Sequence, residues 1–193
     1  MSRQTTDTIR WTTSDLELLP DDGRRYEIID GELFVTRAPH WKHQNVAVRI
    51  GMALERWSME SGLGEAAINP GLVFSEADSV IPDVVWASHD RLATMLDEAG
   101  HLVAAPELVV EVLSPGERNQ RRDRELKLKL YSSYGVLEYW IVNREQQALE
   151  VYQRDQGILK LAMVLYIHDE LTSPVLDGFA APVGQFFSSS QLT

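Results

Sequence analysis

The chain of 193 residues contains no cysteine, which excludes disulfide bonds and metal sites built on thiolates. It also has no apolar run near the roughly 20 residues that a membrane-spanning helix requires. The first fifteen residues lack the apolar stretch of a secretory signal. From these absences we expect a cytoplasmic protein with no membrane segment.

Positive charge is scarce as well. The chain has 18 Lys and Arg against 29 Asp and Glu, which gives a formal net charge of -11. A protein that binds nucleic acid over its whole surface is usually basic. Any contact with phosphate must therefore come from a local patch or through bound cations.

The remaining composition is that of an ordinary globular protein. Hydrophobic residues make up 44% of the chain, which is enough for a sizeable core, and the sequence shows no internal repeat and no low-complexity linker. We expect a single domain over residues 1–193, in which residues 1–20 form an N-terminal extension and the core spans roughly 25–166.

Hydrophobic periodicity predicts a mixture of helices and strands. Two strand-like runs flank Asp30-Gly31, a strong hairpin signal, and Ser14 and Glu17 have the spacing of a capping box. The patterns as a whole predict helices over 11–20, 43–60 and 118–134 and a short helix or ordered loop over 89–100. They predict strands over 66–74, interrupted at Pro70-Gly71, and over 80–87, 107–113 and 136–143, and a hairpin over 148–166 that turns at 155–157. This order indicates an α/β or mixed α+β fold.

Two of the predicted strands carry a carboxylate on an otherwise apolar face. In the stretch PELVVEVLSP, Glu111 shares a face with Val109 and Leu113, and in PDVVW, Asp83 shares one with Val85. A buried carboxylate needs a partner, and two that converge repel each other unless a cation or a proton lies between them. Mg²⁺ commonly binds through one or two carboxylates. Paired strands would therefore make this pair a candidate metal site.

Structural roles are the alternatives for both residues. Asp83 follows a proline, so it could cap a turn at the start or the edge of a strand. Glu111 could form a buried ion pair with an arginine. The sequence leaves these alternatives open.

The helix after the Glu111 strand turns one lysine toward the sheet. At 100° per residue, the predicted buried arc runs from Leu126 to Tyr131, with Lys127 inside it and Lys129 outside. Asp123, four residues before Lys127, could pair with it along the helix. That pairing does not explain why Lys127 faces inward.

The same helix supplies a local basic patch. Residues 118–129 contain six Lys and Arg against two acidic residues, a local net charge of +4. A charge run is often only a solvated face. This one begins directly after the strand that presents Glu111, where a polyanion would have to lie. The candidate DNA-contacting residues are Arg118, Arg121, Arg122 and Arg124.

Several short motifs resemble those of a known family. They are Pro82-Asp83, the stretch PELVVEVLSP, a D-x3-K-x3-Y pattern at Asp123, Lys127 and Tyr131, and the strand GVLEYWIV. In this order they resemble the Uma-type putative restriction endonucleases of the PD-(D/E)XK nuclease superfamily. The resemblance extends from YEIIDGEL to VLDGF, over nearly the whole chain.

The resemblance implies a fold and an activity. The fold is a restriction-endonuclease-like core, a central mixed sheet flanked by helices, with extra terminal hairpins. The activity is that of an endonuclease that hydrolyses DNA phosphodiester bonds with Mg²⁺, for which Mn²⁺ can substitute. Asp83 and Glu111 match the metal-binding positions, and the Val112 carbonyl would join them.

The resemblance also assigns two further site residues. The superfamily pattern places a lysine at position 113, where this chain has Leu113. In the Uma-type family this lysine lies on the following helix, which points to Lys127. His43 matches a family histidine that lines the site. A histidine at the start of a helix could equally turn its ring to solvent.

The alternative function is a binding or scaffold protein that kept the nuclease fold and lost turnover. The sequence has no GxSxG, P-loop or GxGxxG motif, so it gives no support to a serine hydrolase, an NTPase or a dinucleotide-binding protein. A nuclease with one active site per chain can cut both DNA strands as a twofold dimer. We therefore expect a homodimer, with the hairpins over 26–37 and 148–166 as candidate contacts.

Overall fold

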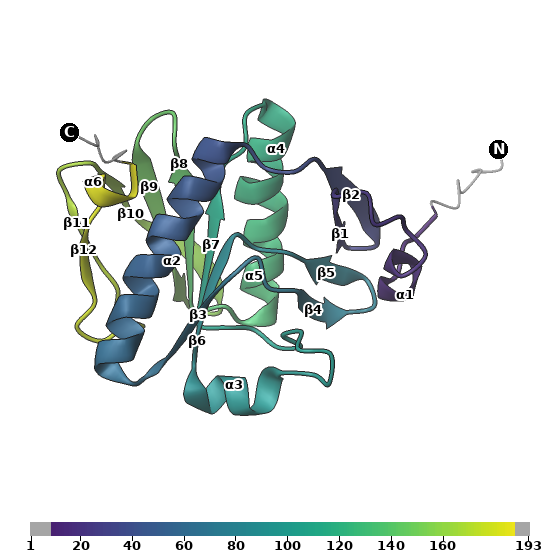
Figure 1. Ribbon diagram of the computed structural model, residues 1–193, viewed down its shortest axis with the longest axis horizontal. Helices are drawn as coiled ribbons and strands as arrows, with labels where there is room; N and C mark the ends of the chain where they lie inside the picture. Colours follow the sequence, from purple (N-terminus) through teal and green to yellow (C-terminus); the bar gives the residue numbers. More distant parts are fainter. Residues whose placement is uncertain (1–8, 188–193) are drawn as a thin grey trace.

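A mixed six-stranded sheet forms the centre of the protein (Figure 1). The computed structural model describes residues 9–187. The strands of the central sheet are β3 (Gly64–Ile68), β6 (Val84–Ser88), β7 (Leu108–Val112), β8 (Glu138–Asn143), β9 (Ala148–Asp155) and β10 (Ile158–Tyr166). Their order is β10-β9-β8-β7-β6-β3, and only β7 and β8 are parallel neighbours.

Helices cover both faces of this sheet. The long helix α2 (Trp41–Ser61) packs on one face and ends at Gly62, whose φ of 68° is left-handed. A continuous helix made of α4 (Glu117–Arg121), the π-helical segment η1 (Arg122–Lys127) and α5 (Leu128–Tyr134) packs on the other. The two long helices predicted from periodicity are therefore confirmed, as is the mixed sheet that they flank.

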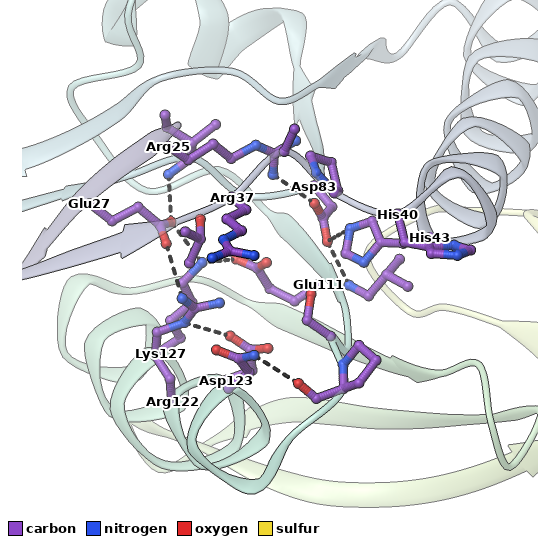
Figure 2. A pocket seen from close by; sticks show the side chains of 18 of the residues that line it. Arg25, Glu27, Arg37, His40, His43, Asp83, Glu111, Arg122, Asp123 and Lys127 are labelled. Carbon is purple, nitrogen blue, oxygen red and sulfur yellow. Dashed lines mark hydrogen bonds and ion pairs between the residues drawn. The ribbon is translucent and has the colours of Figure 1, made fainter. Parts of the chain in front are cut away.

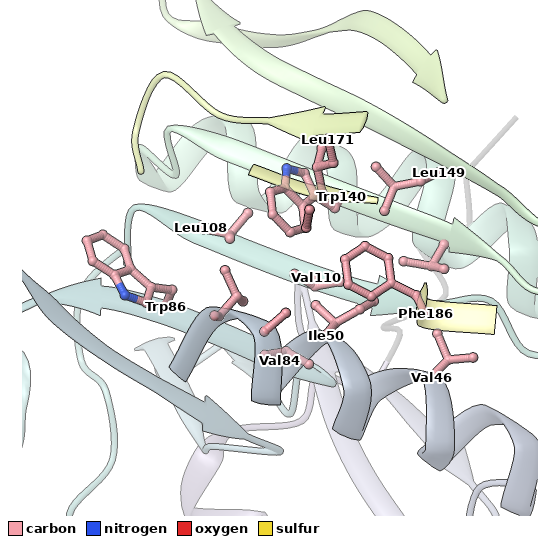
Figure 3. Packing of buried hydrophobic residues seen from close by; sticks show 14 of the residues in the cluster. Val46, Ile50, Val84, Trp86, Leu108, Val110, Trp140, Leu149, Leu171 and Phe186 are labelled. Atoms are coloured by element: carbon pink, nitrogen blue, oxygen red, sulfur yellow. The ribbon is translucent and has the colours of Figure 1, made fainter. Parts of the chain in front are cut away.

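The strand β7 is covered on both sides, as its apolar run predicts (Figure 3). Leu108, Val110 and Val112 point into the cluster on the α2 side, together with residues such as Ile50 and Trp140. The opposite face packs against α5 and contributes a second cluster, which includes Val109, Leu113, Leu130, Tyr131 and Tyr139. Glu111 is the one carboxylate in this strand, and it lies on the α5 side.

The core extends beyond residue 166, which was the C-terminal boundary predicted from the sequence. The short elements β11 (Glu170–Thr172), β12 (Ala180–Pro182) and α6 (Gly184–Phe187) follow the central sheet. Leu171 and Phe186 from this segment are fully buried in the α2-side cluster (Figure 3). Sequence analysis missed these elements because each is too short for a periodic pattern.

A second, four-stranded antiparallel sheet lies beside the first; we call it the accessory sheet (Figure 1). It contains β1 (Arg25–Ile29), β2 (Glu32–Thr36), β4 (Leu72–Ser75) and β5 (Asp78–Val80), in the order β2-β1-β5-β4. The predicted hairpin at Asp30-Gly31 is confirmed, since both residues have left-handed φ values, 50° and 72°. The hairpin of β9 and β10, with its turn at Gln156-Gly157, is confirmed as well.

One predicted strand is wrong as a continuous element, since the strand over 80–87 is split at residues 81–83 between β5 and β6. The interruption predicted at Pro70-Gly71 is confirmed by the break at residues 69–71 between β3 and β4. Each break contains a proline, which cannot donate to a strand ladder. At these two breaks the chain crosses directly between the two sheets, and the two crossings are adjacent, because Asn69 N–H donates to the Asp83 carbonyl at 3.1 Å.

The remaining helices are short. The helix α3 (His89–Met95) confirms the element expected over 89–100. The N-terminal helix α1 (Thr13–Leu16) is only four residues long. Its capping contact joins Thr12 to Asp15, whose carboxylate accepts from the Thr12 N–H and hydroxyl at 2.8 Å, so the predicted capping box at Ser14 and Glu17 is wrong. Within residues 9–187, no helix is long and apolar enough to cross a membrane.

Candidate active site

Asp83 lies at the second crossing between the sheets, directly before β6, and its side chain is buried (Figure 2). Its Oδ2 accepts a hydrogen bond from the Val112 N–H at 2.8 Å, and Arg25 Nη1 lies 3.1 Å from Oδ1. Burial alone would raise the pKa of Asp83. The neighbouring His43 and the Val112 N–H outweigh burial and hold the pKa below its ordinary value. Asp83 is therefore a buried carboxylate ion.

His43 reaches the same carboxylate from α2. Its Nε2 lies 3.0 Å from Asp83 Oδ2, and the side chain is 6% exposed, so a ring turned to solvent is excluded. Within the described part of the chain, neither ring nitrogen makes a hydrogen bond of good geometry. His43 thus lies against Asp83 with hydrogen-bonding capacity left for a water or a substrate group.

Glu111 lies on the α5 side of β7 and forms a buried ion pair. Its Oε1 accepts hydrogen bonds from Lys127 Nζ at 2.7 Å and from the Tyr131 hydroxyl at 2.9 Å. The partner is a lysine, not the arginine that the structural alternative assumed. Burial raises the pKa of Glu111 to about 8, because Lys127 offsets only part of the desolvation and the charge of Asp83 adds repulsion.

Lys127 is 1% exposed and bridges two glutamates (Figure 2). Its Nζ lies 2.7 Å from Glu111 and 2.8 Å from Glu27. Burial alone would lower the pKa of Lys127, but the neighbouring carboxylates outweigh it and raise the pKa. The predicted inward orientation of Lys127 is confirmed, and Lys129 is exposed as predicted. Leu126, placed in the buried arc, is instead 40% exposed.

Glu27 is the site residue that sequence analysis missed. It comes from β1 of the accessory sheet, is 3% exposed, and accepts from the Ile81 N–H at 2.9 Å as well as from Lys127. Burial would raise its pKa, but Lys127 and Arg122 outweigh burial and lower it. The sequence contained the evidence for it, because Glu27 shares a strand face with the apolar Ile29, as Glu111 does with Val109.

Two further charges complete the buried cluster. Arg122 Nε lies 3.2 Å from Asp123 Oδ1, and Arg122 Nη1 lies 3.8 Å from Glu27. Burial raises the pKa of Asp123, against the opposing charges of Lys127 and Arg122. The cluster therefore contains four buried carboxylates, Glu27, Asp83, Glu111 and Asp123, against the three permanent cations Arg25, Arg122 and Lys127. The carboxylates outnumber the cations by one, and the proton that Glu111 keeps at neutral pH removes this excess of negative charge.

The cluster surrounds a cavity of about 350 Å³ (Figure 2). Asp83, Glu111 and Lys127 line it, and Val112 lines it beside them. The exposed residues Arg37 and His40 lie on its solvent side. The structure thus brings the predicted residues of the strand, the crossing and the helix together around one accessible space.

The arginine run is divided between different environments. Arg122 lines the cavity, and Arg118 and Arg121 line a neighbouring groove of about 400 Å³. Arg121 pairs with Glu125 at 3.1 Å, and Arg124 pairs with Glu150 at 2.5 Å. Among the described residues, Arg118 has no ion-pair partner. Much of the local positive charge predicted from the sequence is therefore already neutralised within the protein.

The donor atoms suit a hard divalent cation. No group of three or more His, Cys, Asp or Glu in residues 9–187 is arranged to hold a metal on its own. Mg²⁺, however, usually takes one or two carboxylates and keeps several waters. Asp83 and Glu111 supply carboxylate oxygens at the cavity. Burial is the main cause of the raised pKa of Glu111, and repulsion from Asp83 adds to it, so a bound cation would stabilise the ionised form of Glu111. The residues present fit Mg²⁺ or Mn²⁺.

Comparison with solved structures concerns the fold of the chain. A crystal structure of a putative nuclease of the DUF820 family from Anabaena variabilis superposes with a TM-score of 0.74 at 18% sequence identity, over 91% of this chain and 97% of that one. At this identity the match shows a shared fold. The type IIG restriction endonuclease BpuSI gives a TM-score of 0.43 at 13% identity, over 77% of this chain and 16% of its own. No curated protein matches the chain.

The family model of Uma2, described as "Putative restriction endonuclease", matches residues 13–184. This range contains Glu27, Asp83, Glu111 and Lys127, and it takes in both sheets. The resemblance predicted from the short motifs is thereby confirmed. The chain belongs to the Uma2 family of putative restriction endonucleases, whose description is that of a nuclease.

Proposed function

We propose that this protein is a Mg²⁺-dependent nuclease that hydrolyses phosphodiester bonds in DNA, with Mn²⁺ as a substitute. The family assignment supports a nuclease-type function. The observation that carries the proposal is the cavity lined by Asp83, Glu111 and Lys127, three residues that are distant in sequence. Buried carboxylates beside a buried lysine in an accessible cavity are suited to phosphate chemistry assisted by a metal.

Asp83 and Glu111, with the Val112 carbonyl, are the proposed metal ligands. When bound there, Mg²⁺ would lower the pKa of a coordinated water and neutralise charge that develops on the scissile phosphate. Asp83 is already ionised and fixed by the Val112 N–H. Glu111 has a pKa near 8, so it would release its proton when a cation replaces that proton as its partner.

Lys127 is the proposed electrostatic stabiliser of the transition state. An ammonium group in a buried site acts more strongly on a phosphate than one in water. Glu27 is proposed as its positioning residue, since it would keep Lys127 paired while Glu111 turns toward the metal. Without Glu27, that turn would leave a buried charge with no partner. His43, beside Asp83, is proposed to orient a water or a phosphate oxygen.

The proposed DNA contacts lie around the cavity. Arg118, Arg121 and Arg122 line it or the adjoining groove and would contact backbone phosphates. Arg37, on the solvent side of the cavity, joins them as a candidate that the sequence did not indicate. Arg124 would contribute less, because it is held by Glu150.

The second candidate function is a nuclease-fold binding protein without turnover. The observation that favours it is the closed ion-pair network of the site. Lys127 bonds two glutamates, and Arg25 holds Asp83. A phosphate or a metal must compete with these contacts, and a protein without turnover has no need to open them.

Plasmid cleavage tests the proposal. Supercoiled plasmid is incubated with Mg²⁺, Mn²⁺ or EDTA and with the wild type, Asp83→Asn or Glu111→Ala. The matched control is Glu60→Gln, which changes an exposed glutamate on α2. We expect metal-dependent nicking by the wild type and the control, and its loss in both site variants. Equal nicking by the wild type and Glu111→Ala would refute the nuclease proposal.

Calorimetric titration with Mn²⁺ separates the two candidates without an activity assay. The nuclease proposal expects binding by the wild type and Glu60→Gln, and weaker or no binding by Asp83→Asn. If the wild type binds no divalent cation, the binding-protein candidate is favoured. The titration also reports protons, since a cation that displaces the Glu111 proton makes the heat depend on the buffer.

The proposal includes a homodimer, so that two sites can act on two strands. Its support is the edge strand β10, which leaves several apolar side chains exposed: Ile158, Leu161, Met163, Val164 and Tyr166. Exposed apolar side chains on an unpaired edge favour association. Light scattering at micromolar concentration tests this, and a monomer mass would contradict it.

A further inference from the structure

An exposed tryptophan lies directly beside the candidate active site. Trp41 is the first residue of α2, and the residue is 77% exposed. It follows His40, which lines the active-site cavity, and it lies two residues before His43. Trp41 itself lines a different cavity of about 360 Å³. The start of α2 therefore separates two hollows, with the buried carboxylates in one and the indole in the other.

The cavity at Trp41 is rich in cations. Lys42, Arg49 and Arg144 line it, against a single acidic residue, Glu145. On a chain with a net charge of -11, this excess of positive charge is local. A polyanion that passes the active site could therefore continue across this cavity without meeting the overall negative charge.

Arg144 has an unsatisfied hydrogen-bond donor in this cavity, which a ligand could bind. Its Nε is buried, and it has no hydrogen-bond partner within residues 9–187. Buried donors are nearly always satisfied, so this one is suited to an acceptor that comes from outside the protein. A phosphate oxygen is the acceptor that a guanidinium group binds best. In contrast, Arg49 already donates to the Phe186 carbonyl at 3.3 Å.

Trp41 would contact the base of the nucleotide whose phosphate Arg144 binds. An exposed indole offers a flat surface on which a nucleobase can stack, and every base has such a face. In a duplex, both faces of a base are covered by its neighbours in the stack, so this contact requires an unpaired nucleotide. An aromatic residue beside basic side chains is the combination that binds single-stranded nucleic acid.

We propose that Trp41, with Lys42 and Arg144, forms a subsite for an unpaired nucleotide of a strand that runs through the active site. This inference rests on the proposed nuclease function and deepens it. It names as substrate a nucleic acid with a single-stranded segment beside the scissile phosphate, such as a flap, a loop or a free strand. Trp41 stacks on the base, and the two cations contact the flanking phosphates.

Fluorescence anisotropy in EDTA, where no metal-dependent cleavage occurs, tests the subsite. The probes are a labelled oligothymidylate and a blunt duplex of the same length. The variants are Trp41→Ala and Trp41→Phe, with Met59→Ala as the matched control, since Met59 is an equally exposed apolar residue near the other end of α2. We expect Trp41→Ala to weaken single-strand binding roughly tenfold, Trp41→Phe to keep most of the affinity, and duplex binding to stay unchanged.

Arg144→Ala supplies a second readout. It should reduce the dependence of single-strand affinity on salt by about one unit of the logarithmic slope, because one phosphate contact is lost. A change of less than about twofold in single-strand affinity for Trp41→Ala would overturn the subsite. So would a change in the molecular mass of Trp41→Ala by light scattering, since the surface would then be a contact between copies.

The binding assay and the cleavage assay fail independently. If Trp41→Ala loses single-strand affinity but the wild type cuts neither plasmid nor oligothymidylate with Mg²⁺ or Mn²⁺, the nuclease is refuted and the subsite is kept. Metal-dependent cleavage with affinity independent of Trp41 would keep the nuclease and refute the subsite.

Discussion

Two buried glutamates share the ammonium group of Lys127, and their replacement by glutamine is expected to change stability in opposite directions. Lys127 Nζ lies 2.7 Å from Glu111 and 2.8 Å from Glu27. Both glutamates are almost fully buried. Glutamine has nearly the same shape and can still accept a hydrogen bond, so each substitution removes mainly an ionisable group.

Glu111→Gln is expected to stabilise the protein without metal, and to do so increasingly as the pH rises. Burial raises the pKa of Glu111 from 4.5 to about 8. Between these values the folded protein keeps a proton that the unfolded chain releases, so the wild type loses stability with rising pH. At about 1.36 kcal/mol per pH unit, the loss amounts to at most about 5 kcal/mol. Glutamine has no proton to release and avoids this loss.

Glu27→Gln is expected to destabilise the protein at neutral pH. Burial would raise the pKa of Glu27, but Lys127 and Arg122 outweigh burial and lower it. A lowered pKa means that the stabilising contribution of Glu27 is present above about pH 4.5 and is lost as the pH falls through the lower folded value. Glutamine would leave Lys127 paired only with Glu111, which is largely protonated at neutral pH. Breaking a buried pair in this way costs roughly 3–5 kcal/mol.

Urea denaturation in EDTA, from pH 5 to pH 8, measures both effects. Glu60→Gln is the control for the loss of an exposed carboxylate and should follow the wild type. The free energy of unfolding of Glu111→Gln should rise above that of the wild type as the pH increases, and that of Glu27→Gln should lie below it. If the free energy of unfolding falls by the same amount in both variants at every pH, Glu111 is an ionised partner of Lys127 that stabilises the fold. The nuclease proposal then loses its support from this residue.

Three further predictions concern the lysine, the sheet and the arginines. Lys127→Met should lower metal-dependent cleavage at least about 100-fold while calorimetry still detects Mn²⁺ binding; unchanged cleavage would exclude Lys127 from the chemistry. Gly64→Ala should lower the free energy of unfolding by about 1–3 kcal/mol or more. The reason is that a Cβ at this position would lie 2.3 Å from the Ala87 carbonyl oxygen. If the variant is as stable as the wild type, β3 and β6 are not paired as described. Arg118→Ala should reduce the salt dependence of DNA binding by about one unit of the logarithmic slope, whereas Arg124→Ala should leave it nearly unchanged; equal slopes would contradict the division of the arginine run.

The inward orientation of Glu111 and Lys127 could be predicted from the sequence because each depends on a local pattern. Asp83, which was expected on a strand, instead lies in the break directly before β6. A carboxylate that alternates with buried valines must face the core, and a lysine within the apolar arc of a helix must face the sheet. These rules place side chains on faces of elements. They do not show which groups meet across the fold, so the competition of two glutamates for Lys127 could not be predicted.

Glu27 shows why the remainder could not be predicted. Its own strand pattern marks it as buried, yet its partner Lys127 is 100 residues away in sequence. The contact depends on how the accessory sheet lies against the central sheet. One of the two breaks that fix this position, at residues 81–83, lies within a strand that was predicted to be continuous. The π-helical segment likewise has no local sequence signal, and it moved Leu126 out of the predicted buried arc.

The π-helical turn η1 sets the rotation of the residues before it relative to the residues of α5 after it. In a regular α-helix, one added residue rotates everything beyond it by about 100°. A π-helical turn absorbs such a residue, so that Lys127 can face the site while Leu130 and Tyr131 stay in register with the core. The Tyr139 hydroxyl, which donates to the Asp123 carbonyl at 3.1 Å, ties this turn to the sheet. Deleting one residue from η1 would rotate α4 relative to α5 by about 100°. The helix could then keep either the orientation of Lys127 toward the site or the packing of Leu130 and Tyr131 in the core, but not both.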